Sequence, residues 1–337
     1  MAEALRERGA EVSFVTAKGR SGTGIAAAEG FPERSIPLRG FQRKPTPRNL
    51  AVLAMAVLAV PRSLAALRRA HADVIVTGGG YMAGPVAVAG FLTRRPVVAM
   101  EADSRLGLAN RIIAPFAKRV ALAWPLRKRA SARYLVAGRP VRRSVLAATR
   151  TSGRRAFGIP PDATVVLVVG GSQGARTLNT AAAEAFGPEP PFHVIHVAGP
   201  SQVDDVRAAL EGRNEARYRL EPYLDNLPEA LAAADLVVSR SGGSVFELAA
   251  IGRASILVPY PYATADHQTA NARWLADAGA AILLPDADCT GERLRSLVGA
   301  LLADRRRLEA MAEAARAMGK PDAADRIADA VLEVARP

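Results

Sequence analysis

Cysteine and metal-ligand patterns are almost missing from this sequence of 337 residues. Cys289 is the only cysteine, which excludes a disulfide framework and a cysteine-based metal site. The four histidines lack the spacing that ligands of one metal ion show. We therefore expect neither a metal ion nor a cofactor.

Aromatic residues are also scarce, at 5 % of the chain, whereas lysine and arginine give a formal net charge of +13. A surface this basic favours anionic partners such as nucleic acid, anionic lipid or a phosphorylated substrate. Proteins that bind single-stranded nucleic acid interleave aromatic and basic residues, and this sequence shows no such interleaving. Nucleic acid is therefore not among the predicted partners.

Long apolar runs are absent, and the sequence shows neither a signal peptide nor a membrane-spanning segment. The longest apolar stretch, Leu50–Pro61, ends in a proline and lies between basic residues within Arg34–Arg69. Such a segment suits the surface of an anionic membrane. A buried helix of a first domain with basic ends has the same pattern, and one helix can serve both purposes.

One stretch, Val237–Leu275, carries the strongest functional pattern. An apolar strand is followed by the turn Ser239–Ser244 and at once by a helical pattern that contains Glu247. Strand, glycine turn and helix together direct backbone N–H groups and the positive end of a helix dipole at an anion such as phosphate. Because a carboxylate repels phosphate, we expect Glu247 to accept hydrogen bonds from sugar hydroxyls. Polar residues that suit a second sugar follow a second strand: His267, Gln268 and Asn271.

Each of these pieces alone fits an ordinary segment of alternating strands and helices, but together they favour a nucleotide-sugar site. Two further glycine turns support this interpretation. The strand Thr164–Val169 runs into Gly170–Arg176, and an earlier apolar strand runs into Gly78–Gly80. The alternation predicts doubly wound parallel sheets, in which ligands bind beyond the carboxyl ends of the strands.

Two acidic residues occupy such a place at the carboxyl end of the predicted strand Pro96–Met100. Glu101 and Asp103 lie where chemistry can occur. Asp103 also suits the N-terminal cap of the predicted helix Leu106–Phe116.

These motifs together resemble the MurG family of GT-B glycosyltransferases. The resemblance rests on GGY at 79–81, GGSQGAR at 170–176, SRSGGSVFE at 239–247 and VPYPYA at 258–263, with HQ and NA pairs after it. The family's version of the motif at 239–247 is one residue longer than the motif in this sequence. The family's H-E-Q-N motif stands here as Met100, Glu101, Ala102 and Asp103.

The resemblance implies the GT-B fold, in which two Rossmann-like, doubly wound parallel-sheet domains face each other across a cleft. It implies an inverting transfer of N-acetylglucosamine from UDP-N-acetylglucosamine to undecaprenyl-diphospho-N-acetylmuramoyl-pentapeptide, which converts lipid I to lipid II in peptidoglycan synthesis. The implied partners are this donor, the lipid-linked acceptor and an anionic membrane surface. The implied location is peripheral, on the cytoplasmic side of the cell membrane.

Functional residues of the family carry over only to matching positions. Gly79, Gly80 and Tyr81 are implied to bind the acceptor. Catalysis is expected from Asp103 or Glu101, because the family's proposed base, a histidine in a first glycine-rich turn, has no counterpart here. The residues implied to bind the donor are Arg142, Gly171, Ser172, Gln173, Tyr223, Leu224, Gly242, Gly243, Ser244, Glu247, His267, Gln268 and Asn271.

We expect two domains, which the length of the chain allows. Residues 1–137 would face the acceptor and the membrane, and residues 138–321 would bind the UDP-sugar. A single helix is predicted over Gly291–Met318, and the final segment 322–337 is expected to pack back on the first domain. Arg142, near the boundary, also fits plain solvated surface. The resemblance further implies a first strand and glycine turn before Met1, so the chain as given is expected to be unstable and impaired.

Two other functions are compatible with the same motifs. Another GT-B enzyme would transfer a UDP-sugar to a different lipid, and panels of donors and acceptors would identify it. A UDP-sugar binder without catalytic activity would bind UDP tightly and transfer nothing.

Overall fold

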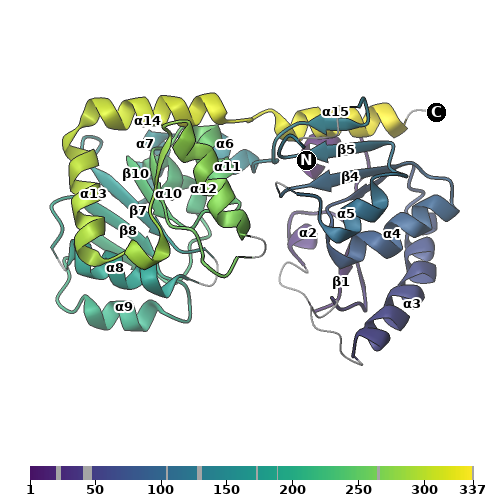
Figure 1. Ribbon diagram of the computed structural model, residues 1–337, viewed down its shortest axis with the longest axis horizontal. Coiled ribbons are helices and arrows are strands. Elements are labelled where there is room, and N and C mark those ends of the chain that lie inside the picture. The colour runs from purple at the N-terminus through teal and green to yellow at the C-terminus, as the bar shows by residue number, and fades with distance from the viewer. Residues whose placement is uncertain are drawn as a thin grey trace. The chain divides into compact units, whose positions relative to one another are not determined.

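The computed structural model describes the chain except for residues 20–23, 41–47, 104, 127–130, 172–173, 188, 264–265 and 336–337, and except for the side chains of 48–51 and 53. The chain forms two compact units (Figure 1). Unit 1 comprises Met1–Pro140 and Asp322–Pro337, and unit 2 comprises Val141–Pro321. Among the described residues, no helix has both the length and the apolar character that crossing a membrane requires.

Unit 2 is built on one parallel sheet of six strands in the order β12-β11-β10-β7-β8-β9. The strand β7 reads VVLVV and is buried at every position, as expected for a strand that is covered on both faces. The strands of this sheet are β7 Val165–Val169, β8 His193–Val197, β9 Tyr218–Glu221, β10 Leu236–Ser239, β11 Ser255–Leu257 and β12 Ala281–Leu283.

Helices pack against the sheet of unit 2. Val166 and Val168 of β7 belong to one core cluster with apolar side chains of α8, α9 and α13. Side chains alternate along a strand, so Val165 and Leu167 face the opposite layer. The helices of unit 2 are α6 Arg143–Ala147, α7 Arg150–Ala156, α8 Arg176–Phe186, α9 Val203–Ala209, α10 Leu227–Ala233, α11 Ser244–Ile251, α12 His267–Asp277, α13 Gly291–Ala303 and α14 Arg305–Met318, with the 3-10 helix η2 at Asp286–Asp288.

The single helix predicted over Gly291–Met318 is wrong, because two helices occupy this segment. Asp304 lies between α13 and α14, and its carboxylate accepts a hydrogen bond from the Arg307 N–H at 2.9 Å. An aspartate in this position caps the start of a new helix. The apolar spacing continues through the break, which is why periodicity alone did not locate it.

Unit 1 contains two parallel sheets, with the orders β1-β2 and β3-β4-β5-β6. The first described strand of this unit begins at Phe14. The helix α3 continues through Pro61. The strands are β1 Phe14–Ala17, β2 Glu33–Ile36, β3 Ile75–Thr77, β4 Val97–Glu101, β5 Arg119–Leu122 and β6 Tyr134–Val136. The helices are α1 Ala2–Glu7, α2 Ile25–Ala28, α3 Arg48–Arg69, α4 Gly80–Leu92, α5 Leu108–Ile113 and α15 Ala323–Ala335.

The helix α15 completes unit 1 although it comes from the other end of the chain (Figure 1). Its Ile327 and Val331 are buried in one cluster with Ala4 and Leu5 of α1. The Arg8 guanidinium donates to Asp325 at 2.9 Å and to Asp329 at 2.7 Å, both on α15. Apolar burial and two ion pairs therefore hold the two ends of the chain together in one unit.

Candidate functional site

The strand order of unit 2 places two glycine turns next to each other. From β7 the chain builds outward through β8 and β9, and it then returns to add β10 on the other side of β7. Ligands of open α/β sheets bind at such a switch point, beyond the carboxyl ends of the strands. The turn that starts at Gly170 follows β7 and leads into α8, and the turn Arg240–Gly243 follows β10 and leads into α11. Two helix N-termini therefore flank the switch point.

The turn after β10 is braced by polar residues of α12. Asn271 is buried and donates from Nδ2 to the Ser241 carbonyl oxygen at 3.0 Å. Ser241 Oγ donates to the Gln268 carbonyl oxygen at 2.8 Å, and Gln268 Oε1 accepts from the Tyr260 N–H at 3.0 Å. These contacts bring the predicted residues Asn271 and Gln268 to the predicted turn. Within the protein, Asn271 supports the backbone of the turn, and Gln268 binds the Ser241 hydroxyl and the Tyr260 N–H.

The outer side of this turn is open. A Cβ atom built on Gly242 would meet no atom of the described residues within 4 Å. Gly243 and Ser244 are half-buried. His267 is the first residue of α12, the helix that connects the neighbouring strand β11 to β12. Asp266 precedes it in the left-handed region, with φ 52°, and accepts from Thr269 Oγ1 at 2.6 Å. Backbone atoms of the turn are thus accessible to a ligand.

Sequence reasoning missed an ion pair that joins the strands of this site. Arg240 directly follows β10 and donates to the Asp286 carboxylate, which also accepts from Thr177 Oγ1 at 3.1 Å. Arg240 donates further to the carbonyl oxygens of Val258 at 3.2 Å and Pro259 at 3.1 Å. One guanidinium therefore fixes the ends of β10, β11 and β12 relative to the first turn of α8. Its position directly after a strand was the available signal.

Glu247 lies in the first turn of α11, as predicted. Arg142 Nε approaches its carboxylate to 3.6 Å. The Glu247 side chain is 19 % exposed and that of Arg142 is 58 % exposed, so the acid is the more enclosed partner. The structure thus places Arg142 beside the turn after β10, although it is distant in sequence.

The glycine turn after β7 is described in part, because the predicted residues Ser172 and Gln173 lie outside the described residues. Gly171 and Gly174 have φ values of 89° and 76°, a backbone conformation that favours glycine. The Gly174 N–H donates to the Gly171 carbonyl oxygen at 3.0 Å and closes the turn.

Tyr223 and Leu224 follow β9, at the outer edge of the sheet. Tyr223 is 57 % exposed, whereas Leu224 is buried. The strand β8 separates β9 from β7, so these two residues lie farther along the same carboxyl edge than the glycine turns do.

In unit 1, the predicted acceptor turn and the predicted catalytic loop follow neighbouring strands, β3 and β4. Gly79 and Gly80 have φ values of 75° and 70°, and α4 begins at Gly80. Tyr81 packs its ring against Gly40, where a Cβ would lie 3.2 Å from the ring. Asn110 of α5, which the sequence did not single out, lies against Gly79, where a Cβ would lie 3.1 Å from its Nδ2.

Glu101 is buried and organises the loop after β4. Its Oε1 accepts from the Asp103 N–H at 3.1 Å, and its Oε2 accepts from the Gly107 N–H at 2.8 Å and from Asn110 Nδ2 at 3.0 Å. Since Asn110 also contacts Gly79, one carboxylate and one amide connect the loop after β4 to the glycine turn after β3.

The sequence-based alternative that Asp103 caps the following helix is wrong. The helix α5 starts at Leu108 with Gly107 as its N-cap, and no side chain of the described residues caps its first turn. The Asp103 side chain is exposed. Glu101 instead binds the backbone at the start of α5, because its buried position lets it reach Gly107.

Unit 1 exposes apolar side chains on two helices that the sequence analysis did not single out. Phe91, Leu108 and Phe116 are 68 %, 73 % and 70 % exposed, and they lie on or next to α4 and α5. The rings of Phe91 and Phe116 touch edge to face, with 6.1 Å between their centres. We name these residues the α4–α5 patch, with further exposed members Val88, Leu92 and Ile112. Exposed basic residues accompany it: Arg94, Arg95, Arg105, Arg111 and Lys118.

The predicted segment Arg34–Arg69 also exposes apolar side chains. Val57 and Leu58 of α3 are 63 % and 56 % exposed, but Ala59 and Leu67 are buried. The predicted flanking residues Arg43 and Lys44 lie outside the described residues, as does the side chain of Leu53. The helix α3 thus buries one face and exposes two apolar residues on the other.

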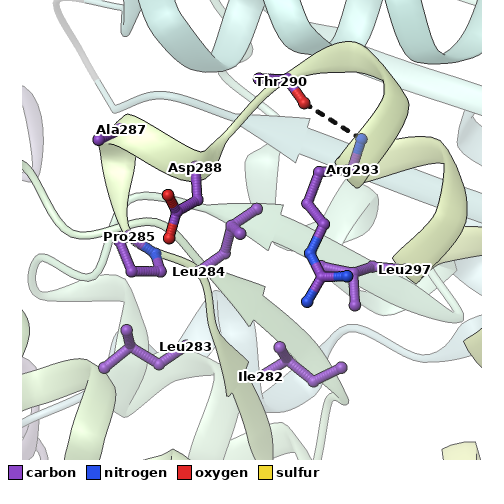
Figure 2. A pocket seen from close by; sticks show the side chains of 9 residues that line it. All are labelled: Ile282, Leu283, Leu284, Pro285, Ala287, Asp288, Thr290, Arg293 and Leu297. Carbon is purple, nitrogen blue, oxygen red and sulfur yellow. Dashed lines mark hydrogen bonds between the residues drawn. The ribbon is translucent and has the colours of Figure 1, made fainter.

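A cavity of about 510 Å³ lies at the edge strand β12, and none of the residues that line it belongs to the glycine turns (Figure 2). It is lined by Ile282 and Leu283 of β12 and by Arg293 and Leu297 of α13, and the Thr290 hydroxyl accepts from the Arg293 N–H at 3.2 Å beside it. The strand β11 separates β12 from β10, which carries the second glycine turn.

Comparisons with known proteins agree with the two-unit architecture. The family descriptions that match are "Glycosyltransferase family 28 N-terminal domain" over residues 1–122 and "Glycosyltransferase family 28 C-terminal domain" over residues 165–327. The crystal structure of Acinetobacter baumannii MurG superposes with a TM-score of 0.76 at 29 % identity and covers 98 % of this chain and 94 % of that chain.

Curated relatives match over nearly the whole chain. Proteins of Desulforudis audaxviator and Rubrobacter xylanophilus are each 38 % identical to it; the matches cover 99 % and 100 % of this chain and 94 % and 99 % of the relatives. Both are named UDP-N-acetylglucosamine--N-acetylmuramyl-(pentapeptide) pyrophosphoryl-undecaprenol N-acetylglucosamine transferase. The chain therefore belongs to the MurG family, within glycosyltransferase family 28, and has the GT-B fold.

Proposed function

We propose that this chain transfers N-acetylglucosamine from UDP-N-acetylglucosamine to undecaprenyl-diphospho-N-acetylmuramoyl-pentapeptide, with inversion at the anomeric carbon. The observation that carries the proposal is the pair of glycine turns at the switch point of unit 2, in a chain of the MurG family. Two helix N-termini with accessible backbone N–H groups suit a diphosphate. The same groups stabilise the negative charge that develops on UDP as it leaves.

In this proposal unit 2 binds the donor. The turn residues Gly171, Ser172, Gln173, Gly242, Gly243 and Ser244 bind the diphosphate. Glu247 accepts hydrogen bonds from the ribose hydroxyls, and Arg142 beside it contributes a positive charge near the diphosphate. The segment Tyr223–Leu224 contacts uracil. His267 and Gln268 lie beside the transferred sugar, and Asn271 contributes by holding the turn that binds the phosphates.

Unit 1 binds the acceptor in this proposal, with Gly79, Gly80 and Tyr81 at its diphosphate. Asp103, an exposed carboxylate at the end of β4, takes the proton from the acceptor hydroxyl. The hydroxyl oxygen then forms the bond to the anomeric carbon while the bond from that carbon to the UDP oxygen breaks. Glu101 is fully hydrogen-bonded within the loop, and its part is to hold Asp103 in place.

We further propose that the chain associates peripherally with the cytoplasmic side of the membrane through the α4–α5 patch. Exposed aromatic and aliphatic side chains among arginines and lysines suit an anionic lipid surface. A lipid-linked acceptor then meets unit 1 at the surface to which unit 1 is bound.

The test is a transfer assay with labelled UDP-N-acetylglucosamine and a lipid-linked muramoyl-pentapeptide acceptor. We expect a labelled lipid product, no product with UDP-glucose, and a strongly reduced rate with Glu247→Ala. Transfer to other lipids in preference to this acceptor would instead identify a different GT-B lipid glycosyltransferase. Tight UDP binding without transfer to any acceptor would identify a non-catalytic binder.

A further inference from the structure

Three buried polar side chains below the glycine turn of α8 form a continuous chain of hydrogen bonds. The Tyr218 hydroxyl lies 2.9 Å from His196 Nδ1, and His196 Nε2 lies 3.0 Å from Asn179 Oδ1. All three side chains are at most 2 % exposed. They come from β9, β8 and α8, so the chain crosses from the sheet to the helix that the glycine turn precedes.

The direction of each hydrogen bond follows from the last residue. Asn179 Nδ2 donates to the Ala198 carbonyl oxygen at 2.8 Å and to Gln202 Oε1 at 3.0 Å, so its Oδ1 is the acceptor for His196. His196 therefore carries its proton on Nε2, and its Nδ1 accepts from the Tyr218 hydroxyl. Burial lowers the pKa of His196 to about 3, so the ring is neutral at physiological pH. The chain is thus uncharged and has one arrangement of protons.

The same chain reaches the glycine turn through Ala198. A Cβ atom on Gly174 would lie 2.2 Å from the Ala198 carbonyl oxygen and 3.0 Å from Gln202 Nε2. Gly174 therefore rests directly on the carbonyl group and the side chain that Asn179 holds. Asn179 also lies in the first turn of α8, where its N–H donates to the Ala175 carbonyl oxygen at 2.8 Å.

We propose that Tyr218, His196 and Asn179 are positioning residues for the donor diphosphate. They fix Ala198 and the first turn of α8, and through Gly174 they fix the end of the glycine turn that leads into α8. The inference rests on the proposed function, because it assumes that this turn binds the donor. A network of this kind is uncharged, so it sets the geometry of the turn without adding a charge beside the phosphates.

The decisive measurements are UDP affinity by calorimetry and the separate KM values for donor and acceptor in the transfer assay. Asn179→Ala is expected to weaken UDP binding and raise the donor KM about tenfold, which corresponds to misaligning roughly one hydrogen bond to a charged group. Tyr218→Phe removes only the hydroxyl and is expected to have an effect of about threefold in the same direction. The acceptor KM should stay unchanged in both variants.

Leu210→Ala is the matched control, because Leu210 is fully buried in the same core cluster and lies outside the hydrogen-bonded chain. It should lower the melting temperature and leave the donor KM unchanged. If Asn179→Ala does not fold, the UDP affinity of Tyr218→Phe, which is the mildest change, tests the proposal by itself. The proposal is overturned if Tyr218→Phe binds UDP as tightly as the unmodified chain, or if Leu210→Ala weakens UDP binding equally. If the unmodified chain binds no UDP, the proposed function fails as well.

Discussion

Replacing Glu101 tests whether its carboxylate organises unit 1 or takes part in the reaction. Glu101→Gln keeps the shape of the side chain but exchanges one acceptor oxygen for an NH2 group. The carboxylate accepts hydrogen bonds from Asp103 N–H at 3.1 Å, Gly107 N–H at 2.8 Å and Asn110 Nδ2 at 3.0 Å. Whichever way the amide turns, its NH2 group faces at least one N–H of the protein.

The expected loss follows from these contacts. A hydrogen bond to a charged group contributes ~1.5–3 kcal/mol, and a buried donor that loses its acceptor costs a similar amount. Glu101 is 8 % exposed, so water replaces the missing partner poorly. We expect the free energy of unfolding of unit 1 to fall by about 2 kcal/mol, which lowers the melting temperature of a domain of this size by about 4–8 °C.

Calorimetric melting and the transfer assay measure the two effects in parallel. Asp103→Asn is the matched variant, because the Asp103 side chain is exposed and its removal should leave the melting temperature unchanged. Asp103 is the proposed base, so the Asp103→Asn chain should transfer N-acetylglucosamine ~10²–10⁴-fold more slowly than the unmodified chain. The reasoning is refuted if Glu101→Gln melts like the unmodified chain yet loses all transfer, since that is the behaviour of a residue that contacts the reacting atoms.

Three further predictions concern the donor site, the surface and the pH dependence of stability. Glu247→Ala should weaken UDP binding by ~1–3 kcal/mol because the ribose hydroxyls lose their acceptor, and an unchanged calorimetric affinity would remove Glu247 from the site. Phe91→Asp combined with Phe116→Asp should reduce co-sedimentation with anionic vesicles, whereas Leu146→Asp on unit 2 should not; equal binding of the unmodified chain to neutral vesicles would contradict the patch. Burial lowers the pKa of His196 from its ordinary value of 6.5 to about 3. The unfolded chain therefore takes up this proton first as the pH falls, and the free energy of unfolding should fall by about 1.4 kcal/mol per pH unit between about pH 6 and pH 4. His196→Phe should flatten that slope in thermal unfolding, and an unaltered slope would show that other groups cause it.

The parallel-sheet fold was predictable because its signals are local. Buried parallel strands such as Val165–Val169 read as continuous apolar runs, and each glycine turn marks where a strand ends and a helix starts. The break at Asp304 was not predicted, because the apolar spacing continues across it while a capping hydrogen bond decides the geometry. The exposed apolar residues of α4 and α5 were not predicted for a related reason. Composition identifies apolar residues, but only packing determines which of them are left uncovered.

The candidate site was predictable where the chemistry lies in the backbone. The glycines at 171, 242 and 243 follow strands, and their position in the sequence is enough to suggest an anion site. Residues whose hydrogen-bond partners lie elsewhere in the sequence were missed, since nothing beside them in the sequence indicates the partner. Asn110, Asn179 and Asp286 are of this kind, and each joins two segments far apart in the chain. Asn271, which the sequence predicted to bind the sugar, likewise donates from Nδ2 to the Ser241 carbonyl oxygen.

The packing of α15 on α1 has a consequence for the order in which the protein is made. Ile327 and Val331 are needed to cover Ala4 and Leu5, yet they leave the ribosome only after unit 2. All of unit 2 has been translated by then and can fold as a unit. Unit 1 therefore completes its fold after unit 2, although most of its sequence is translated first. The apolar side chains of α1 stay uncovered while unit 2 is being translated.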